Sequence, residues 1–396
     1  MFSDMHAWIP VFFLYFSQQV SLQDIITLSA IYYFAVCFLE VPCGLASDRL
    51  GRRITLVASA FSAICAFSVF LIGGSFFILA AGQILMALAI ALQSGTDTAM
   101  HYDSLKNLNL DGEYLGREAH AEKLGLLALA VSTLAGGVLA IYDLRWAYVL
   151  SLLGAIATFI VTLQFKEPNA VDGQNKEPVG QSIVKCFLYL RQPVLCWMFL
   201  VMTLMYCLEH FTYEFYQPYI SLLVASGADL PELFRDQSSA PLLSGIIISI
   251  SMFSGSLGAA ISVRFYKLLG IFWLLILALV IQLSILAGMY SILALVTLLP
   301  VMMRNFPMAL IHAPVNAEIA PRVETQHRAT YLSIQSLAQR LVMSGMLIFL
   351  SVGVDQNQAL TWPVLQGILG KALIFGATCL ILALGFKKVF KSSTVE

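Results

Sequence analysis

Several long apolar segments of this sequence contain ionisable side chains. These are the residues that could bind a charged group or exchange a proton. Asp97 lies in "GTDTAMH", with His101 one helical turn later on the same face. The segment "CLEHFTYEFYQP" carries Glu209, His210 and Glu214. Carboxyl and imidazole groups exchange protons near neutral pH when their surroundings tune them. These residues therefore predict proton exchange, binding of a charged solute, or both, with Asp97, Glu209 and Glu214 as carriers and His210 as modulator.

Two arginines, Arg304 and Arg340, lie near the middle of two further apolar segments. A charge at bilayer depth is costly unless it is paired, hydrated or neutralised. One interpretation is a polar central cavity that binds substrate and exchanges protons. The other is a set of internal ion pairs, in which Glu209 or Glu214 pairs with one of the arginines. Acids alone would favour a cationic solute, whereas the arginines also allow an anionic or zwitterionic one.

Aromatic residues are concentrated in the same segment as Glu209. They can line a site for an amphipathic ligand, although such residues more often serve packing. They are Tyr206, Phe211, Tyr213, Phe215, Tyr216 and Tyr219.

The composition places these residues in a membrane. Hydrophobic residues make up 59% of the chain and charged residues 11%, and the mean hydropathy is +0.83. A soluble domain has roughly 25% charged residues. The net charge of −1 gives no basic surface for nucleic acid. The scattered cysteines indicate core positions, and no metal site, cofactor motif or catalytic motif such as HExxH, GxSxG or a Walker loop is present.

The apolar segments predict an all-α integral membrane protein with twelve transmembrane helices. A bilayer core needs about 20 apolar residues for each helical crossing. The predicted spans are 3–17, 22–46, 54–73, 76–104, 121–141, 145–165, 192–224, 240–265, 270–290, 292–318, 328–352 and 366–387.

A polar stretch divides these spans into six and six. The stretch "KEPNAVDGQNKEPVGQS" begins at Lys166 and has no apolar periodicity. We therefore predict a six-helix bundle over residues 1–165, a cytoplasmic linker over 166–191, and a second six-helix bundle with a short tail over 192–396.

The positions of Lys and Arg predict the orientation, because basic loops stay in the cytoplasm. Of the 22 Lys and Arg residues, only Arg145 and Arg235 fall in loops on one predicted face. Arg304, Arg340 and Lys371 lie in or near spans, and all the others fall on the opposite face. We therefore expect the protein in the inner membrane, with both termini and the linker in the cytoplasm.

The first predicted span, residues 3–17, is short for a crossing. Either the membrane is thinned locally or the natural chain begins upstream of Met1. We favour the second interpretation, which would place Asp4 and His6 near mid-bilayer.

The stretch "LEVPCGLASDRLGRR" ends an apolar run in a dense group of charges between the second and third spans. Cytoplasmic retention of the loop explains its arginines, but acidic residues contribute little to topology, so Asp48 needs another explanation. Small residues before it allow close helix approach, and Gly51 permits a tight turn.

Within this stretch, "GLASDRLGRR" resembles the signature Gly-x-x-x-Asp-Arg-x-Gly-Arg-Arg of the major facilitator superfamily, at the same place between the second and third helices. "LEVPCG", "SGTDTAMHYDSLK" and "HRATYLSIQSL" look like a subset of bacterial members. The matching signature residues are Gly44, Asp48, Arg49, Gly51, Arg52 and Arg53.

The resemblance implies two pseudo-symmetric six-helix bundles that rock about a central site. It also implies that the loop acts as a latch. In that scheme Asp48 accepts hydrogen bonds from the start of the eleventh helix, near residues 328–330, and Arg49 or Arg52 pairs with Asp103. These contacts would hold the outward-facing state.

The resemblance to the family also bears on function. Many antiporters of the family carry glycines and a proline in the fifth span. Here Ala128, Ser132, Gly136 and Gly137 are small, but Thr133 stands at the proline position, and small residues also serve packing. We predict a monomeric, non-enzymatic secondary transporter that exports a small organic solute by proton antiport. The alternatives are uptake of a nutrient or metal chelate, or a receptor without transport.

Overall fold

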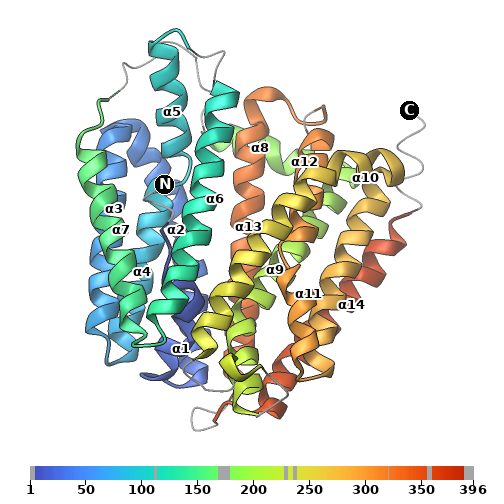
Figure 1. The fold of residues 1–396 in the computed structure, drawn as a ribbon. Coiled ribbons are helices and arrows are strands. Elements are labelled where there is room, and N and C mark those ends of the chain that lie inside the picture. The colour runs from blue at the N-terminus through green and yellow to red at the C-terminus, as the bar shows by residue number, and fades with distance from the viewer. Residues whose placement is uncertain are drawn as a thin grey trace. The chain divides into compact units, whose positions relative to one another are not determined.

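A computed structural model describes residues 5–110, 114–167, 179–226, 231–234, 239–319, 321–354 and 359–387, and regular structure in these ranges is helical (Figure 1). Three short 3-10 helices cover Ile9–Val11, Glu232–Phe234 and Leu295–Thr297. The α-helices are α1 (Phe12–Ser17), α2 (Leu22–Leu50), α3 (Arg52–Ile72), α4 (Phe76–Gln93), α5 (Thr96–Asn107), α6 (Tyr114–Leu139), α7 (Arg145–Leu163), α8 (Val179–Tyr189), α9 (Pro193–Ala225), α10 (Ala240–Ser291), α11 (Leu298–Met302), α12 (Phe306–Ile319), α13 (Thr325–Val352) and α14 (Trp362–Gly385).

These helices account for the predicted spans. Within the ranges above, 9 helical segments are long and apolar enough to cross a membrane. α10 holds two predicted spans, because its residues continue through Gly270, whose φ of 68° and ψ of 167° are not helical. In α6 the apolar part is the shorter Leu124–Leu139. The first predicted span consists only of a 3-10 turn and α1, so its shortness in the sequence is also seen in the fold.

Two predicted spans are broken within the bilayer. The fourth span stops at Gln93 and restarts at Thr96, because Gly95 adopts a left-handed φ of 72°. The tenth span is divided at residues 303–305, between α11 and α12. Broken helices expose backbone polar groups, and membrane proteins tolerate them where protein or a water-filled cavity surrounds them. Both breaks lie next to ionisable residues singled out by the sequence.

The chain forms two compact units. The first comprises residues 1–173 together with 236–249 and 344–359, and the second comprises 174–235, 250–343 and 360–396. The boundaries proposed from the sequence at 165 and 191 stay a prediction, and residues 168–178 lie outside the described ranges.

Aromatic packing holds the short first helix in the first unit. The Tyr15 hydroxyl donates a hydrogen bond of 2.7 Å to the Phe70 carbonyl oxygen of α3. The ring of Tyr15 lies 4.3 Å from that of Tyr148 in α7, and the Trp8 backbone N–H donates to the Ser151 hydroxyl at 3.1 Å. Burial of these large rings compensates for the few residues in α1.

The glycines of the fifth span serve close packing inside the first unit. A Cβ on Gly136 would lie 2.0 Å from the Ala7 carbonyl oxygen, and one on Gly137 would lie 2.8 Å from that of Pro241. Across this contact, a Cβ on Gly245 of α10 would lie 3.0 Å from the Thr133 carbonyl oxygen. No larger side chain fits between these backbones. The packing interpretation of this stretch therefore holds, and the stretch alone gives no argument for transport direction.

Candidate functional site

The signature loop, residues 44–53, ends one helix and starts the next with a single residue between them. α2 ends at Leu50 and α3 begins at Arg52, so Gly51 serves as the C-cap of the first and the N-cap of the second. Its φ is +97°, a conformation that side-chain-bearing residues rarely adopt. The tight turn expected at Gly51 is present.

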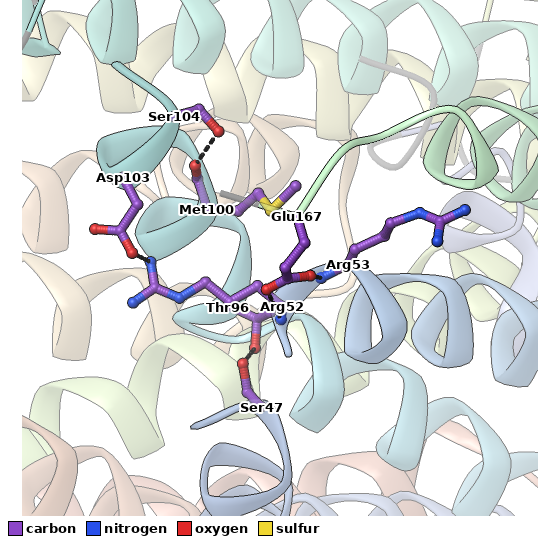
Figure 2. Close-up of polar contacts among 8 residues, drawn as sticks. All are labelled: Ser47, Arg52, Arg53, Thr96, Met100, Asp103, Ser104 and Glu167. Atoms are coloured by element: carbon purple, nitrogen blue, oxygen red, sulfur yellow. Dashed lines mark hydrogen bonds and ion pairs between the residues drawn. The ribbon is translucent and has the colours of Figure 1, made fainter. Parts of the chain in front are cut away.

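Glu167, just after α7, caps the N-terminus of α3. Its two carboxylate oxygens accept hydrogen bonds from the backbone N–H groups of Arg52 and Arg53, at 2.7 and 2.8 Å (Figure 2). In return, the Arg53 guanidinium donates at 2.8 Å to the Leu163 carbonyl oxygen in the last turn of α7. Each helix end thus receives the charge that its dipole favours. A Cβ on Gly51 would lie 3.0 Å from the Glu167 carboxyl carbon, so glycine also makes room for this cap.

Arg52 and Asp103 form an ion pair between the signature loop and α5 (Figure 2). Their side chains are 24% and 19% exposed, so water only partly screens the pair. The structure therefore brings together two residues that the sequence singled out from separate segments. It ties the start of α3 to the C-terminal half of α5, the second segment of the broken fourth span.

A second set of contacts surrounds the break in the fourth span. The Thr96 hydroxyl donates to the Ser47 hydroxyl at 3.1 Å, linking α5 to α2. The Ser94 hydroxyl donates to a Glu40 carboxylate oxygen at 3.3 Å. Asp97 is exposed in the first turn of α5, where it accepts hydrogen bonds from the backbone N–H and the hydroxyl of Thr98. The N-terminal end of α5 favours a negative charge there.

Part of the latch prediction concerns side chains that the structure does not describe. The side chain of Asp48, and those of Arg328 and Ala329 at the start of the eleventh predicted span, lie outside the described residues. Arg49 is exposed. Among the described residues, no atom of a neighbouring segment lies within 4 Å of a Cβ built on Gly44, and the contact that the structure shows for the small residues of this stretch is at Ser47.

In the second unit, five residues form what we call the α9 cluster: Glu209, His210, Tyr213, Tyr216 and Arg304. The imidazole of His210 stacks on Tyr206, with ring centroids 3.8 Å apart. Its Nδ1 lies 3.0 Å from the Tyr206 carbonyl oxygen. A carbonyl oxygen only accepts, so Nδ1 carries the proton, and in the neutral ring Nε2 is the acceptor.

Arg304 lies in the turn that breaks the tenth span, and its side chain is only 3% exposed. Its guanidinium carbon is 4.9 Å from the ring centroid of Tyr213 and 5.7 Å from that of Tyr216. Its Nε has no hydrogen-bond partner, and no carboxylate among the described residues lies within 4.0 Å of it. A cation–π contact contributes about 0.5–2 kcal/mol, less than the several kcal/mol that a buried charge costs.

The remaining predicted residues lie around Arg304 in different ways. The guanidinium is the charged neighbour of Glu209 and acts also on His210, on which the Arg340 charge acts as well. Glu214 is buried on α9, at 8% exposure. His101 is half-buried on α5 in the first unit, one turn after Asp97. The ionisable residues thus form two groups, one in each unit. No ion pair joins Glu209 to Arg304 in the part of the chain that is described, and the alternative pairing of Glu209 or Glu214 with Arg340 stays a prediction.

The family is decided by a match over most of the chain. The model of the Major Facilitator Superfamily matches residues 1–347. The chain belongs to the Major Facilitator Superfamily. Like the other members of this superfamily, it is a membrane-embedded secondary transporter of small solutes and not an enzyme.

Solved superfamily structures share the fold. A variant of the nucleoside transporter NupG aligns with a TM-score of 0.77 at 13% identity, over 96% of each chain. A bacterial homologue of the human lysosomal transporter Spinster gives 0.66 at 14% identity, over 97% of this chain and 92% of that one. A variant of the peptide transporter POT gives 0.66 at 12% identity, over 98% and 93%. No curated protein sequence matches the chain. At these identities the similarity is one of superfamily fold.

Sequence reasoning missed two carboxylates of the first unit's network. Glu167 was counted only as part of the polar linker, and Glu40 only as part of a resembling motif. Both had a detectable signal: Glu167 directly follows a predicted span, where it can reach a neighbouring helix end, and Glu40 is an acid inside an apolar run.

Proposed function

We propose that this superfamily member exports a small organic solute in exchange for protons, by alternating access. The observation that carries the proposal is the α9 cluster, in which the charge of the buried Arg304 guanidinium acts on the Glu209 carboxyl group and on the His210 imidazole, within a transporter fold. A site that binds a solute and exchanges a proton needs titratable groups beside a fixed charge.

In this proposal Glu209 is the main proton carrier of the second unit, and His210 modulates it. Asp97 is the carrier of the first unit, since it lies beside the break at Gly95, on whose other side Ser94 binds Glu40. Glu214 and His101 support them, and Arg340 contributes positive charge next to His210.

The signature loop acts in the proposal as a breakable contact between states. Arg52 and Asp103 hold the loop to α5, and Glu167 holds the start of α3. Asp48 and Arg49 are proposed to complete the latch, with Asp48 bound to the start of the eleventh span. Residues 1–165 would rock against residues 192–396 about the linker 166–191.

The proposed location is the inner membrane, with both termini in the cytoplasm. The distribution of Lys and Arg supports it. The protein is proposed to work as a monomer in the lipid bilayer, with protons and one small-molecule substrate as partners.

The test uses purified protein in proteoliposomes with a trapped pH-sensitive dye. Solutes from a chemically diverse panel are added outside without an imposed gradient. Antiport predicts that the lumen becomes more alkaline as a transported solute enters and protons leave. Glu209→Gln should abolish this signal, whereas Glu232→Gln, an exposed acid in a 3-10 turn, should retain it.

Other outcomes separate the alternatives. Lumen acidification on solute addition would indicate proton symport and hence uptake. A solute that raises the melting temperature but moves neither itself nor protons would indicate a receptor. An alkaline shift that persists in both Glu209→Gln and Asp97→Asn would reject the assigned carriers.

A further inference from the structure

A buried Nε–H group of Arg304 without a hydrogen-bond partner indicates the chemistry of the solute. Within the described chain, Arg304 is the buried cation of the α9 cluster, and its Nε has no hydrogen-bond partner. A buried polar group without a partner is costly and uncommon in native proteins. The cation–π contacts with the neighbouring tyrosine rings do not supply this Nε–H group with a hydrogen-bond acceptor.

The guanidinium of Arg304 lies against two aromatic rings. Its carbon is 4.9 Å from the ring centroid of Tyr213 and 5.7 Å from that of Tyr216, both in α9. The N–H groups lie in the plane of the guanidinium, in a fork that matches the two oxygens of a carboxylate. The hydroxyl of Tyr216 accepts a hydrogen bond of 2.9 Å from the Gln217 amide, which fixes that ring.

The helix break holds Arg304 in place from the opposite side. Asn305, the next residue, directs its amide nitrogen to the Met252 sulfur of α10 at 3.3 Å. A Cβ on Gly258 would lie 2.6 Å from the Phe306 carbonyl oxygen, so α10 packs directly on the start of α12. The start of α12 adds a positive helix end close to the guanidinium.

We propose that Arg304 binds the carboxylate group of the transported organic solute. The proposal rests on the transport function proposed above, and it names the substrate class. In proton antiport, a cationic group of the solute competes with the proton for the Glu209 carboxylate. A solute that is exported by antiport would therefore carry an amine as well as a carboxylate. A carboxylate without an amine would instead be expected to enter with a proton.

The test compares solutes that share a skeleton and differ only in charge. The phenyl series is 3-phenylpropanoate, its methyl ester, 2-phenylethylamine and phenylalanine, and the linear series is butanoate, its methyl ester, butylamine and 4-aminobutanoate. Melting temperatures of the purified full chain are measured at millimolar solute. Carboxylates from at least one series should raise the melting temperature, and the corresponding ester and amine should not.

Variants assign the effect to Arg304. In Arg304→Gln the carboxylate-dependent shift should disappear, with at least a tenfold weaker apparent Kd. Arg304→Lys keeps the charge but loses the fork, and should bind with intermediate affinity. Arg264→Gln, an exposed arginine on α10, should bind like the wild type. If Arg304→Gln does not purify as a monodisperse protein, the comparison of Arg304→Lys with the wild type decides.

The proposal is overturned if no carboxylate stabilises the protein, if the esters stabilise it equally, or if the shift survives Arg304→Gln or is unchanged in Arg304→Lys. Failure of the transport proposal looks different. Arg304-dependent carboxylate binding without any solute or proton movement in proteoliposomes would keep the subsite and reject transport. Transport of only neutral or cationic solutes, unaffected by Arg304→Gln, would reject the carboxylate subsite and keep the transport proposal.

Discussion

The charged side chains of the signature loop and those of the α9 cluster differ in their partners. In the loop, Arg52 pairs with Asp103, Arg53 bonds the end of α7, and Glu167 bonds the start of α3. In the cluster, Arg304 is more deeply buried, its guanidinium lies against two tyrosine rings, and its Nε has no hydrogen-bond partner. Matched charges at partly exposed positions stabilise a local arrangement, whereas a buried charge with unmet hydrogen-bonding capacity is costly unless a ligand completes it. The difference agrees with the two roles proposed above, a conformational one for the first region and a binding one for the second.

The largest expected effect comes from removing the unmatched charge. Arg304→Gln should lower kcat/KM for the transported solute about 100-fold, the scale for losing one desolvated charged contact. Its melting temperature should stay the same or rise, because a costly buried charge is lost. Initial transport rates and thermal unfolding check both parts. A marked fall in the melting temperature with transport intact would make Arg304 a structural residue and remove the contrast between the regions.

Charge reversal in the loop should have the next largest effect. Arg52→Glu and Asp103→Arg each place like charges together and should slow transport about tenfold, the equivalent of about 1.4 kcal/mol. The double variant restores an opposite-charge pair and should recover to within about threefold of the wild type. Transport assays on the four proteins of this cycle measure the coupling. Additive losses in the double variant would show that the pair does not act as a unit.

A smaller effect is expected at the turn between α2 and α3. Gly51→Ala forces a side chain into a φ of +97° and against the Glu167 carboxyl group. It should lower the free energy of unfolding by about 1–2 kcal/mol. Gly44→Ala is the matched control, because among the described residues no atom of a neighbouring segment lies within 4 Å of its added methyl group. Denaturant titration in micelles compares the two, and equal losses would argue against the strained turn.

The smallest effect is expected from the cap itself. Glu167→Ala removes the acceptors for two exposed backbone N–H groups of α3 and should cost about 1 kcal/mol. Glu232→Ala should cost almost nothing, since Glu232 is exposed in a short turn. Gly51→Ala should be less harmful in the Glu167→Ala background, because the closest obstacle is gone. The same unfolding measurements test this, and a full cost of Gly51→Ala in that background would assign the whole loss to backbone strain.

The sequence alone determined the membrane class, the number and order of the spans, and the superfamily. These follow from local quantities, since the length of an apolar run decides whether a helix crosses a bilayer, and the signature residues around Gly51 are contiguous. It also singled out Asp97, Glu209 and Arg304, because a charge inside an apolar run is visible without a structure.

Only the tertiary structure decided which of these charges meet. Glu167 lies 115 residues after Arg52 and 114 residues after Arg53 in the sequence, yet it bonds the backbone of both. A local sequence pattern does not specify which distant helix end such a residue reaches. The breaks at Gly95 and at residues 303–305 are also set by the fold, because the polar residues at them, among them Ser94, Asp97 and Asn305, fit a polar helix face as well as a turn. Whether Glu209 or two tyrosine rings would face Arg304 depends on the packing of α9 against the turn before α12. Partners of a buried charge are set by the rotation and depth of neighbouring helices, quantities that a one-dimensional pattern does not contain.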